Sequence, residues 1–128
     1  MVEVNNLTKT KVNKKFLKEI AKKVLEKESV GRQEKGLEVS IALVEPKKIK
    51  ELNKRYRGKN QTTDVLSFSY NNSGEIIICP KEVKKNSKRF SSNFQIELTR
   101  VLIHGLLHLL GFHHQSSKEK KYLSQFYG

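Results

Sequence analysis

The most constraining stretch of this sequence is the apolar run FQIELTRVLIHGLLHLL at residues 94–110, which carries two histidines. Its apolar residues cover most faces of a helix, and a helix of that kind is stable only when it is buried on most sides. Asn93 precedes the run as a good N-cap, and Gly111 follows it where left-handed backbone commonly ends a helix. We therefore predict a long helix that runs through the middle of the fold.

The rest of the chain alternates between strand and helix patterns. Strand patterns occupy residues 2–4, 37–44, 65–70 and 75–79, and the turn NNSG at 71–74 joins the last two into a hairpin. Helix patterns occupy residues 14–28, the segment after Pro46 up to Gly58, and the tail from Ser116, whereas residues 81–89 form a basic connector that can be helical. This order predicts one α+β domain over residues 1–128, with a mixed sheet of about four strands packed around the long helix.

Charge is the strongest global property of the chain. Lysine and arginine number 26 against 13 acidic residues, which gives a net charge of +13. Such a field attracts polyanions, so nucleic acid or an anionic membrane surface is indicated, although a lysine-rich soluble protein without such a ligand would share it. Cys79 is the only cysteine, no signal peptide is evident and no apolar run approaches the ~20 residues of a membrane span. The sequence thus predicts a soluble cytoplasmic protein with no membrane partner.

All four histidines lie within residues 104–114, in the segment HGLLHLLGFHH. His104 and His108 are four residues apart on the predicted helix, so they share one face and both imidazoles can reach one ion. After the turn at Gly111, either His113 or His114 can return to the same ion. Three imidazoles leave one tetrahedral position open, which is the pattern of catalytic zinc. We expect one Zn²⁺ per chain, although imidazole also suits copper, nickel or iron.

The spacing of the histidines also matches the H-x-x-x-H-x-x-G-x-x-H frame of the metzincin proteases, so a metzincin-like zinc site is expected. Those proteases carry a glutamate directly after the first histidine as their general base, and this chain has Gly105 there. The missing proton acceptor disfavours proteolysis. A metal-dependent peptidase is nevertheless one alternative to be tested.

Three separate motifs resemble the YbeY-type endoribonucleases, which mature ribosomal RNA. Residues 104–114 follow H-G-x-L-H-L-x-G-[YF]-D-H at every defined position but one, RYRGKNQTTDVLSF at 55–68 is similar to YRGKD-x-x-TDVLSF, and GEIIICP at 74–80 is similar to GDIVICP. The resemblance implies a single α+β domain with zinc on three histidines beside a basic cleft. It implies cleavage of single-stranded RNA in maturation of the 3′ end of small-subunit rRNA, and a part in ribosome quality control.

Carried over by position, the resemblance makes His104, His108 and His114 the metal ligands, and Arg57 the arginine associated with activity. A solvated cation at a helix end is the alternative for Arg57. The family has aspartate where this chain has His113. His113 can shuttle a proton in its place or compete with His114 for the metal, so the identity of the general base is left open.

Further residues are candidates because they lie near these motifs. The cations that flank Arg57 are expected to hold the RNA backbone: Lys54, Arg55 and Lys59. Three polar residues are candidates for supporting the site: Ser67, Glu97 and Asp64. Asp64 can hold Arg57, or it can bond local backbone in a turn. Ser67 can face the cleft or line the sheet, and Glu97 can pair with a neighbouring lysine instead. The expected partners are RNA and the ribosome or its small subunit, bound by a monomer.

One alternative is not an enzyme. A zinc-stabilised factor that binds RNA or the ribosome would hold a structural metal, and a structural site needs a fourth protein ligand. His113 or Cys79 is the candidate for that ligand. For Cys79 a buried core position at a strand end is the competing interpretation.

Overall fold

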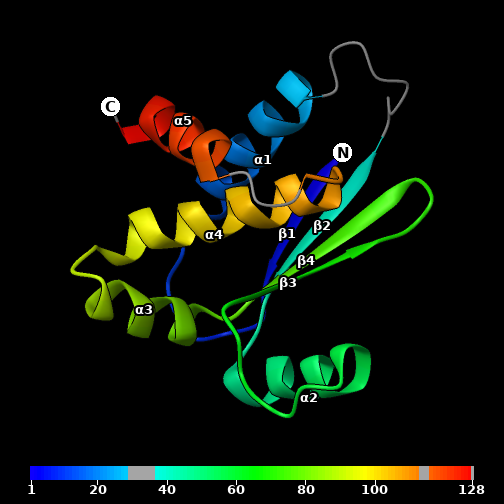
Figure 1. The fold of residues 1–128 in the computed structure, drawn as a ribbon, viewed down its shortest axis with the longest axis vertical. Helices are drawn as coiled ribbons and strands as arrows, with labels where there is room; N and C mark the ends of the chain where they lie inside the picture. Colours follow the sequence, from blue (N-terminus) through cyan, green and yellow to red (C-terminus); the bar gives the residue numbers. More distant parts are fainter. Residues whose placement is uncertain (29–36, 113–115, 128) are drawn as a thin grey trace.

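A computed structural model of the chain describes residues 1–28, 37–112 and 116–127. Within these ranges four strands and five helices follow one another (Figure 1). In chain order they are β1 (Val2–Asn6), α1 (Lys14–Glu28), β2 (Glu38–Leu43), α2 (Pro46–Arg57), β3 (Val65–Ser69), β4 (Ser73–Ile78), α3 (Pro80–Arg89), α4 (Phe94–Leu109) and α5 (Ser116–Tyr127). The predicted α+β class is confirmed.

The four strands form one mixed sheet in the order β1-β2-β4-β3. β1, β2 and β4 are parallel, and β3 pairs antiparallel with β4 as a strand at the edge of the sheet. In the register, Ile41 of β2 lies beside Ile76 of β4, and Ser67 of β3 lies on the other side of Ile76. Among the described residues no strand pairs with the outer side of β3, and the candidate site lies beside this edge.

The predicted hairpin is present, with a shift in where its second strand begins. The Tyr70 N–H donates to the Ser73 carbonyl at 2.8 Å, so the loop holds only two residues and β4 begins at Ser73. Gly74 is therefore a strand residue and not part of the turn. A side chain there would meet Leu109, because a Cβ on Gly74 would lie 2.7 Å from its Cδ1. Gly74 lets helix α4 approach the sheet closely.

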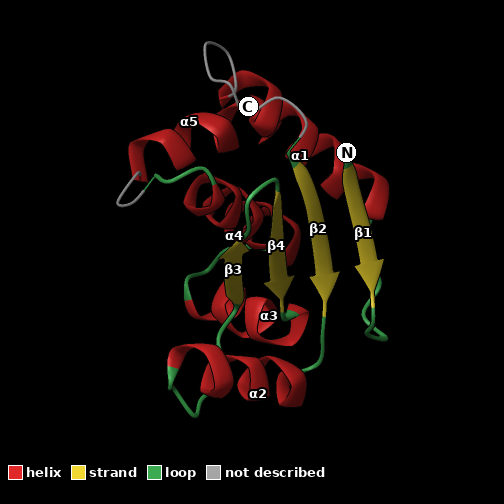
Figure 2. Cartoon of the chain, turned by 90° about the vertical axis from the view of Figure 1, so that its right-hand side faces the viewer, coloured by secondary structure: helices red, strands yellow, loops and turns green. Residues whose placement is uncertain are grey.

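The two faces of the sheet are covered unequally (Figure 2). The larger core lies between the sheet and helices α1, α3, α4 and α5, and its fully buried members include Leu17, Ile20, Ile41, Ile76, Ile78, Leu98, Leu102, Ile103 and Leu106. A smaller core lies under α2 on the opposite face and contains Val44, Ile49, Leu66, Ile77 and Cys79. The alternation of Ile76, Ile77 and Ile78 between these cores follows from the two-residue period of a strand. Helix α4 thus lies at the centre of one layer only.

Residues 81–89, expected to be a basic connector, belong to a regular helix. Pro80 opens α3 at its first position, Glu82 lies in the first turn, and the buried Val83 packs into the larger core. Because α3 lies against α4, it supports the long helix. None of the helices in the described ranges is both long and apolar enough to cross a membrane.

Candidate metal centre

Helix α4 places His104 and His108 side by side. The Asn93 side chain caps its N-terminus by accepting a hydrogen bond from the Ile96 N–H at 2.8 Å. The centroids of the two imidazole rings lie 4.4 Å apart, with their planes at 41°. The His104 side chain is 42% exposed, whereas Leu106 and Leu107 on the other faces are buried. The pair therefore lies where α4 emerges from the core, in reach of one shared ion.

The end of α4 redirects the chain after the second histidine. Gly111 has φ +89°, its N–H donates to the His108 carbonyl at 3.0 Å, and the Phe112 N–H donates to the Leu107 carbonyl at 2.9 Å. This pair of bonds is the Schellman arrangement, which needs a residue with left-handed backbone at Gly111. The predicted helix end is confirmed.

The third imidazole of the predicted site cannot be placed. His113 and His114 lie outside the described residues, and within the described ranges no three potential metal-binding side chains gather in one group. Two adjacent imidazoles on a partly exposed helix face suit zinc, since imidazole nitrogen is a common ligand of that ion. His104 and His108 thus fit a metal, while the complete ligand set and the metzincin-like geometry stay predictions.

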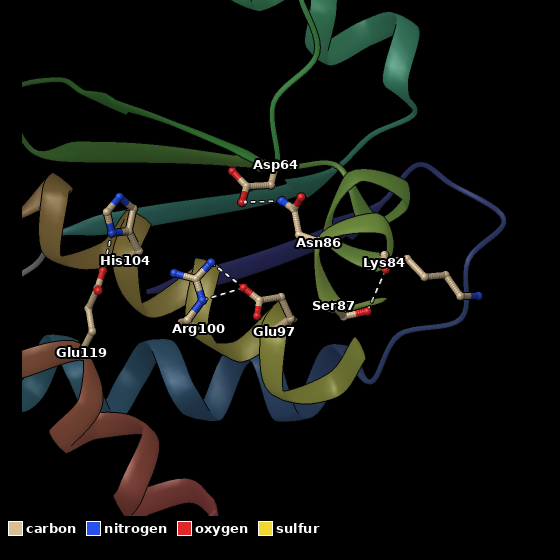
Figure 3. A network of polar contacts seen from close by, with 8 residues as sticks. All are labelled: Asp64, Lys84, Asn86, Ser87, Glu97, Arg100, His104 and Glu119. Atoms are coloured by element: carbon tan, nitrogen blue, oxygen red, sulfur yellow. Dashed lines mark hydrogen bonds and ion pairs between the residues drawn. The ribbon is translucent and has the colours of Figure 1, made fainter. Parts of the chain in front are cut away.

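Glu119, which sequence reasoning missed, lies against the first histidine. Its carboxylate Oε1 accepts a hydrogen bond from Nδ1 of His104, across the contact between α5 and α4 (Figure 3). No local spacing connects the two residues, which are fifteen positions apart on either side of the turn at Gly111. The available signal was composition, because Glu119 is the only acidic residue after Glu97.

Gly105, beside His104, faces the sheet. A Cβ at this position would lie 3.1 Å from both Ile76 Cγ2 and Ser67 Oγ. Side chains of strands β3 and β4 therefore occupy the space that a side chain at position 105 would need. A glutamate there, as metzincins carry it, would have to displace them.

Arg57 is connected to α4 through the edge strand. Its Nη2 donates to the Ser67 carbonyl at 3.0 Å, and the Ser67 hydroxyl donates to the Gly105 carbonyl at 3.1 Å. The Arg57 guanidinium carbon also lies 5.8 Å from the centre of the Phe68 ring. Arg57 is exposed but not merely solvated, because these contacts hold it at the edge of β3, two hydrogen bonds from the residue that follows His104.

The three further cations lie around Arg57. Lys54 and Arg55 belong to the last turn of α2, and Lys59 follows Gly58, whose φ of +70° ends that helix. All three are exposed. Together with Arg57 they form a cationic end of α2, which is the arrangement expected of a surface that binds a phosphate backbone.

The acidic candidates pair with side chains outside the histidine cluster, and for Glu97 a neighbouring cation was the alternative partner. Asp64 accepts a hydrogen bond from the Asn86 amide at 3.3 Å, which joins the start of β3 to α3, and it was expected to hold Arg57 (Figure 3). Glu97 is 4% exposed and accepts from Nε of Arg100 at 2.6 Å, one turn further along α4. Both carboxylates therefore brace helices, and Ser67 is the polar candidate that contacts the backbone beside His104.

Cys79 is a core residue. It is fully buried in the smaller core under α2, on the face of the sheet away from α4, and burial raises the pKa of its thiol. The sheet therefore separates the Cys79 side chain from α4, which carries His104 and His108. The suggestion that Cys79 completes a structural zinc site is wrong, and the core interpretation is confirmed.

Comparison with known proteins agrees with the motifs. The family model described as Endoribonuclease YbeY matches residues 3–126. An endoribonuclease YbeY from Petrotoga mobilis is 42% identical over 120 residues, covering 91% of this chain and 81% of the relative, and one from Thermodesulfovibrio yellowstonii is 44% identical over 110 residues, covering 80% and 69%. A solution structure of a Thermotoga maritima protein superposes with a TM-score of 0.64 at 34% identity, over 98% of this chain and 88% of that one. The chain therefore belongs to the YbeY endoribonuclease family.

Proposed function

We propose that this protein is a zinc-dependent endoribonuclease that cuts single-stranded RNA between the histidine pair of α4 and Arg57. The observation that carries the proposal is the hydrogen-bonded path from Arg57 through Ser67 to Gly105, beside His104. It connects Arg57, through an edge strand, to the backbone of α4 one residue after His104. The family name of the relatives supports ribonuclease chemistry and lends no support to a peptidase.

His104, His108 and His114 are the residues that would hold the metal. When bound, zinc supplies a Lewis acid and lowers the pKa of water, which allows hydrolysis near neutral pH. Arg57 binds the scissile phosphate with two N–H groups and offsets the negative charge that grows in the transition state. His113 occupies the position of the family's aspartate, next to the third ligand, and in this proposal it takes over the proton transfer of that aspartate.

The cationic end of α2 holds the RNA on either side of the cut. Lys54, Arg55 and Lys59 are exposed there and are suited to contact phosphates without reading sequence. The net charge of +13 adds a long-range attraction for the polyanion. Charge alone supports a polyanion. From the family resemblance we propose that the substrate is ribosomal RNA near the 3′ end of the small-subunit species, bound in the cytoplasm by a monomer that works on the ribosome.

An aromatic pair beside Arg57 is suited to take a base of that strand. Tyr56 is 59% exposed and its ring packs on that of Phe68 with centroids 5.3 Å apart and planes at 64°. A base stacked on an aromatic side chain contributes about 1–3 kcal/mol to binding of single strands. We therefore place one unpaired base of the substrate on Tyr56, next to the phosphate held by Arg57.

The test is cleavage of a single-stranded fragment from the 3′ end of small-subunit rRNA. We expect a chelator or His104→Ala to abolish cleavage, and Arg57→Ala to lower kcat about 100- to 1000-fold, as for other donors that stabilise transition-state charge. Arg55→Ala removes another exposed cation from the last turn of the same helix and serves as the control. It should change mainly the salt dependence of RNA binding. Full cleavage by His104→Ala at unchanged metal content would contradict the proposal.

Two further readouts address the mechanism, and a third addresses the peptidase alternative. His113→Asp restores the family residue, so cleavage should persist in that variant with a changed pH profile. Products that end in a 2′,3′-cyclic phosphate would indicate attack by the 2′-hydroxyl instead of hydrolysis. Cleavage of casein by the zinc-loaded protein would favour the peptidase alternative.

A further inference from the structure

We propose that Glu119 is a positioning residue that turns the His104 ring so that its Nε2 faces the metal. This inference rests on the metal site of the proposed function, and it assigns a role to a residue outside the family motifs quoted above. It starts from one contact: Oε1 of Glu119 accepts a hydrogen bond from Nδ1 of His104 (Figure 3).

The contact determines which ring nitrogen is available. An ionised carboxylate only accepts hydrogen bonds, so it selects the form of His104 that carries its proton on Nδ1. The lone pair then resides on Nε2, on the far side of the ring from Glu119. A carboxylate behind a ligating histidine also makes the ring more basic, which strengthens its bond to the metal.

Burial of Glu119 strengthens its hydrogen bond to His104. The Glu119 side chain is only 15% exposed, whereas that of His104 is 42% exposed. Solvent therefore screens this hydrogen bond less than it would a surface ion pair.

Helix α5, which carries Glu119, is anchored on both sides of that residue. Lys118 Nζ lies 2.8 Å from Oε1 of Glu28 at the end of α1, and the Tyr122 hydroxyl donates to the other oxygen of the same carboxylate. Lys118 and Tyr122 are four residues apart, so they share the face of α5 that meets α1. Tyr122 is buried, and desolvation together with the bond to Glu28 raises its pKa.

The same anchor reaches the end of α4. The Lys118 ammonium lies 4.5 Å from the centre of the Phe112 ring, just after the turn at Gly111. Lys118 thus contacts both α1 and the segment that leads towards the predicted third ligand. These contacts hold the first turns of α5 in place. Glu119 therefore reaches His104 from a helix with a fixed position and not from a loop.

The geometry also excludes a different role for Glu119. A general base must reach water or substrate on the open side of the metal. Glu119 contacts Nδ1. With Nε2 as the ligating nitrogen, the ring would stand between the carboxylate and the reacting atoms. It acts through His104 and does not replace the aspartate that the chain lacks at position 113.

The experiment measures zinc affinity of the full-length protein by competition with a chelating dye. We expect Glu119→Gln to weaken zinc binding about tenfold and Glu119→Ala to weaken it up to about 100-fold, the range found for such supporting groups. Glu97→Gln is the matched control, because it removes the charge of another buried carboxylate on the adjoining helix that pairs with Arg100 and not with His104. Its zinc affinity should equal that of the wild type.

A spectroscopic readout accompanies the affinity. The visible absorption bands of the cobalt-substituted protein should shift in Glu119→Gln and stay unchanged in Glu97→Gln. Only the Glu119 change alters the hydrogen bond to His104, which is the proposed metal ligand. Thermal unfolding of the metal-free proteins checks that each variant is folded.

The outcomes separate the two proposals. Unchanged zinc affinity and cobalt spectra in both Glu119 variants would overturn the positioning role while leaving the nuclease proposal intact. If the wild type binds zinc no better than His104→Ala, the metal site itself is wrong and both proposals fail. If the Glu119 variants lose zinc but the loaded wild type cuts no RNA, only the nuclease proposal fails.

Discussion

Replacing Gly105 by alanine tests how tightly α4 is seated on the edge strand. In an exposed helix this change stabilises a protein by about 1 kcal/mol, because glycine has the greater freedom to lose on folding. Here the new Cβ would lie 3.1 Å from Ile76 Cγ2 and from Ser67 Oγ. Ile76 is fully buried and the Ser67 hydroxyl is bonded to the Gly105 carbonyl, so neither can move aside without loss.

Overpacking of this kind costs about 1–3 kcal/mol. The net expectation for Gly105→Ala is therefore a loss of about 1 kcal/mol in the free energy of unfolding, or about 3 °C in Tm. Urea denaturation of the metal-free protein measures this loss. The control is the same change in a Ser67→Ala background, where one of the two close contacts is gone and the loss of stability should be smaller. A stabilisation of about 1 kcal/mol would refute the close packing, because that is the value for an unobstructed helical glycine.

Three other expectations concern single side chains. Tyr56→Leu should weaken the binding of a single-stranded oligonucleotide to the metal-free protein about tenfold. Tyr70→Leu is the control, because Tyr70 is 58% exposed against 59% for Tyr56 but lies beside the hairpin loop, and it should not weaken binding. Equal effects of the two changes would count against stacking on Tyr56. Asn93→Ala removes the N-cap of α4 and should lower the free energy of unfolding by about 1 kcal/mol in the same urea assay, and no change would mean that the cap adds nothing. Tyr122 keeps its proton in the folded state beyond the ordinary pKa of 10.0, so above that pH the unfolded chain loses a proton that the folded chain retains and stability falls. Tyr122→Phe should flatten this decline by up to about 1.4 kcal/mol per pH unit, and identical slopes would contradict the raised pKa.

The parts of the fold that depend on local pattern were predictable from the sequence. The apolar run of α4, its cap at Asn93 and its end at Gly111 are each encoded within a few residues, so the positions of His104 and His108 on one face followed from spacing alone. The hairpin was predicted in type, but not the start of β4, because Gly74 serves the packing of Leu109 and not the turn. A residue's function in long-range packing leaves no mark in its immediate neighbours.

The supporting parts of the site depend on tertiary contacts and could not be predicted. Glu119 meets His104 because α5 packs against α4, and Lys118 also joins α5 to Glu28 of α1, ninety positions away. Asp64 was expected near Arg57 because the two are close in sequence, yet the start of β3 directs Asp64 to Asn86. Arg57 instead binds the Ser67 carbonyl, since an edge strand offers backbone acceptors that sequence patterns do not reveal.

X-ray absorption at the zinc edge of the loaded protein reports whether α4 carries an open zinc site. We expect three imidazole nitrogens at about 2.0–2.1 Å and one oxygen from solvent. A shell of four imidazoles, or a sulfur scatterer at about 2.3 Å, would mean a closed structural site and would rule out the open one.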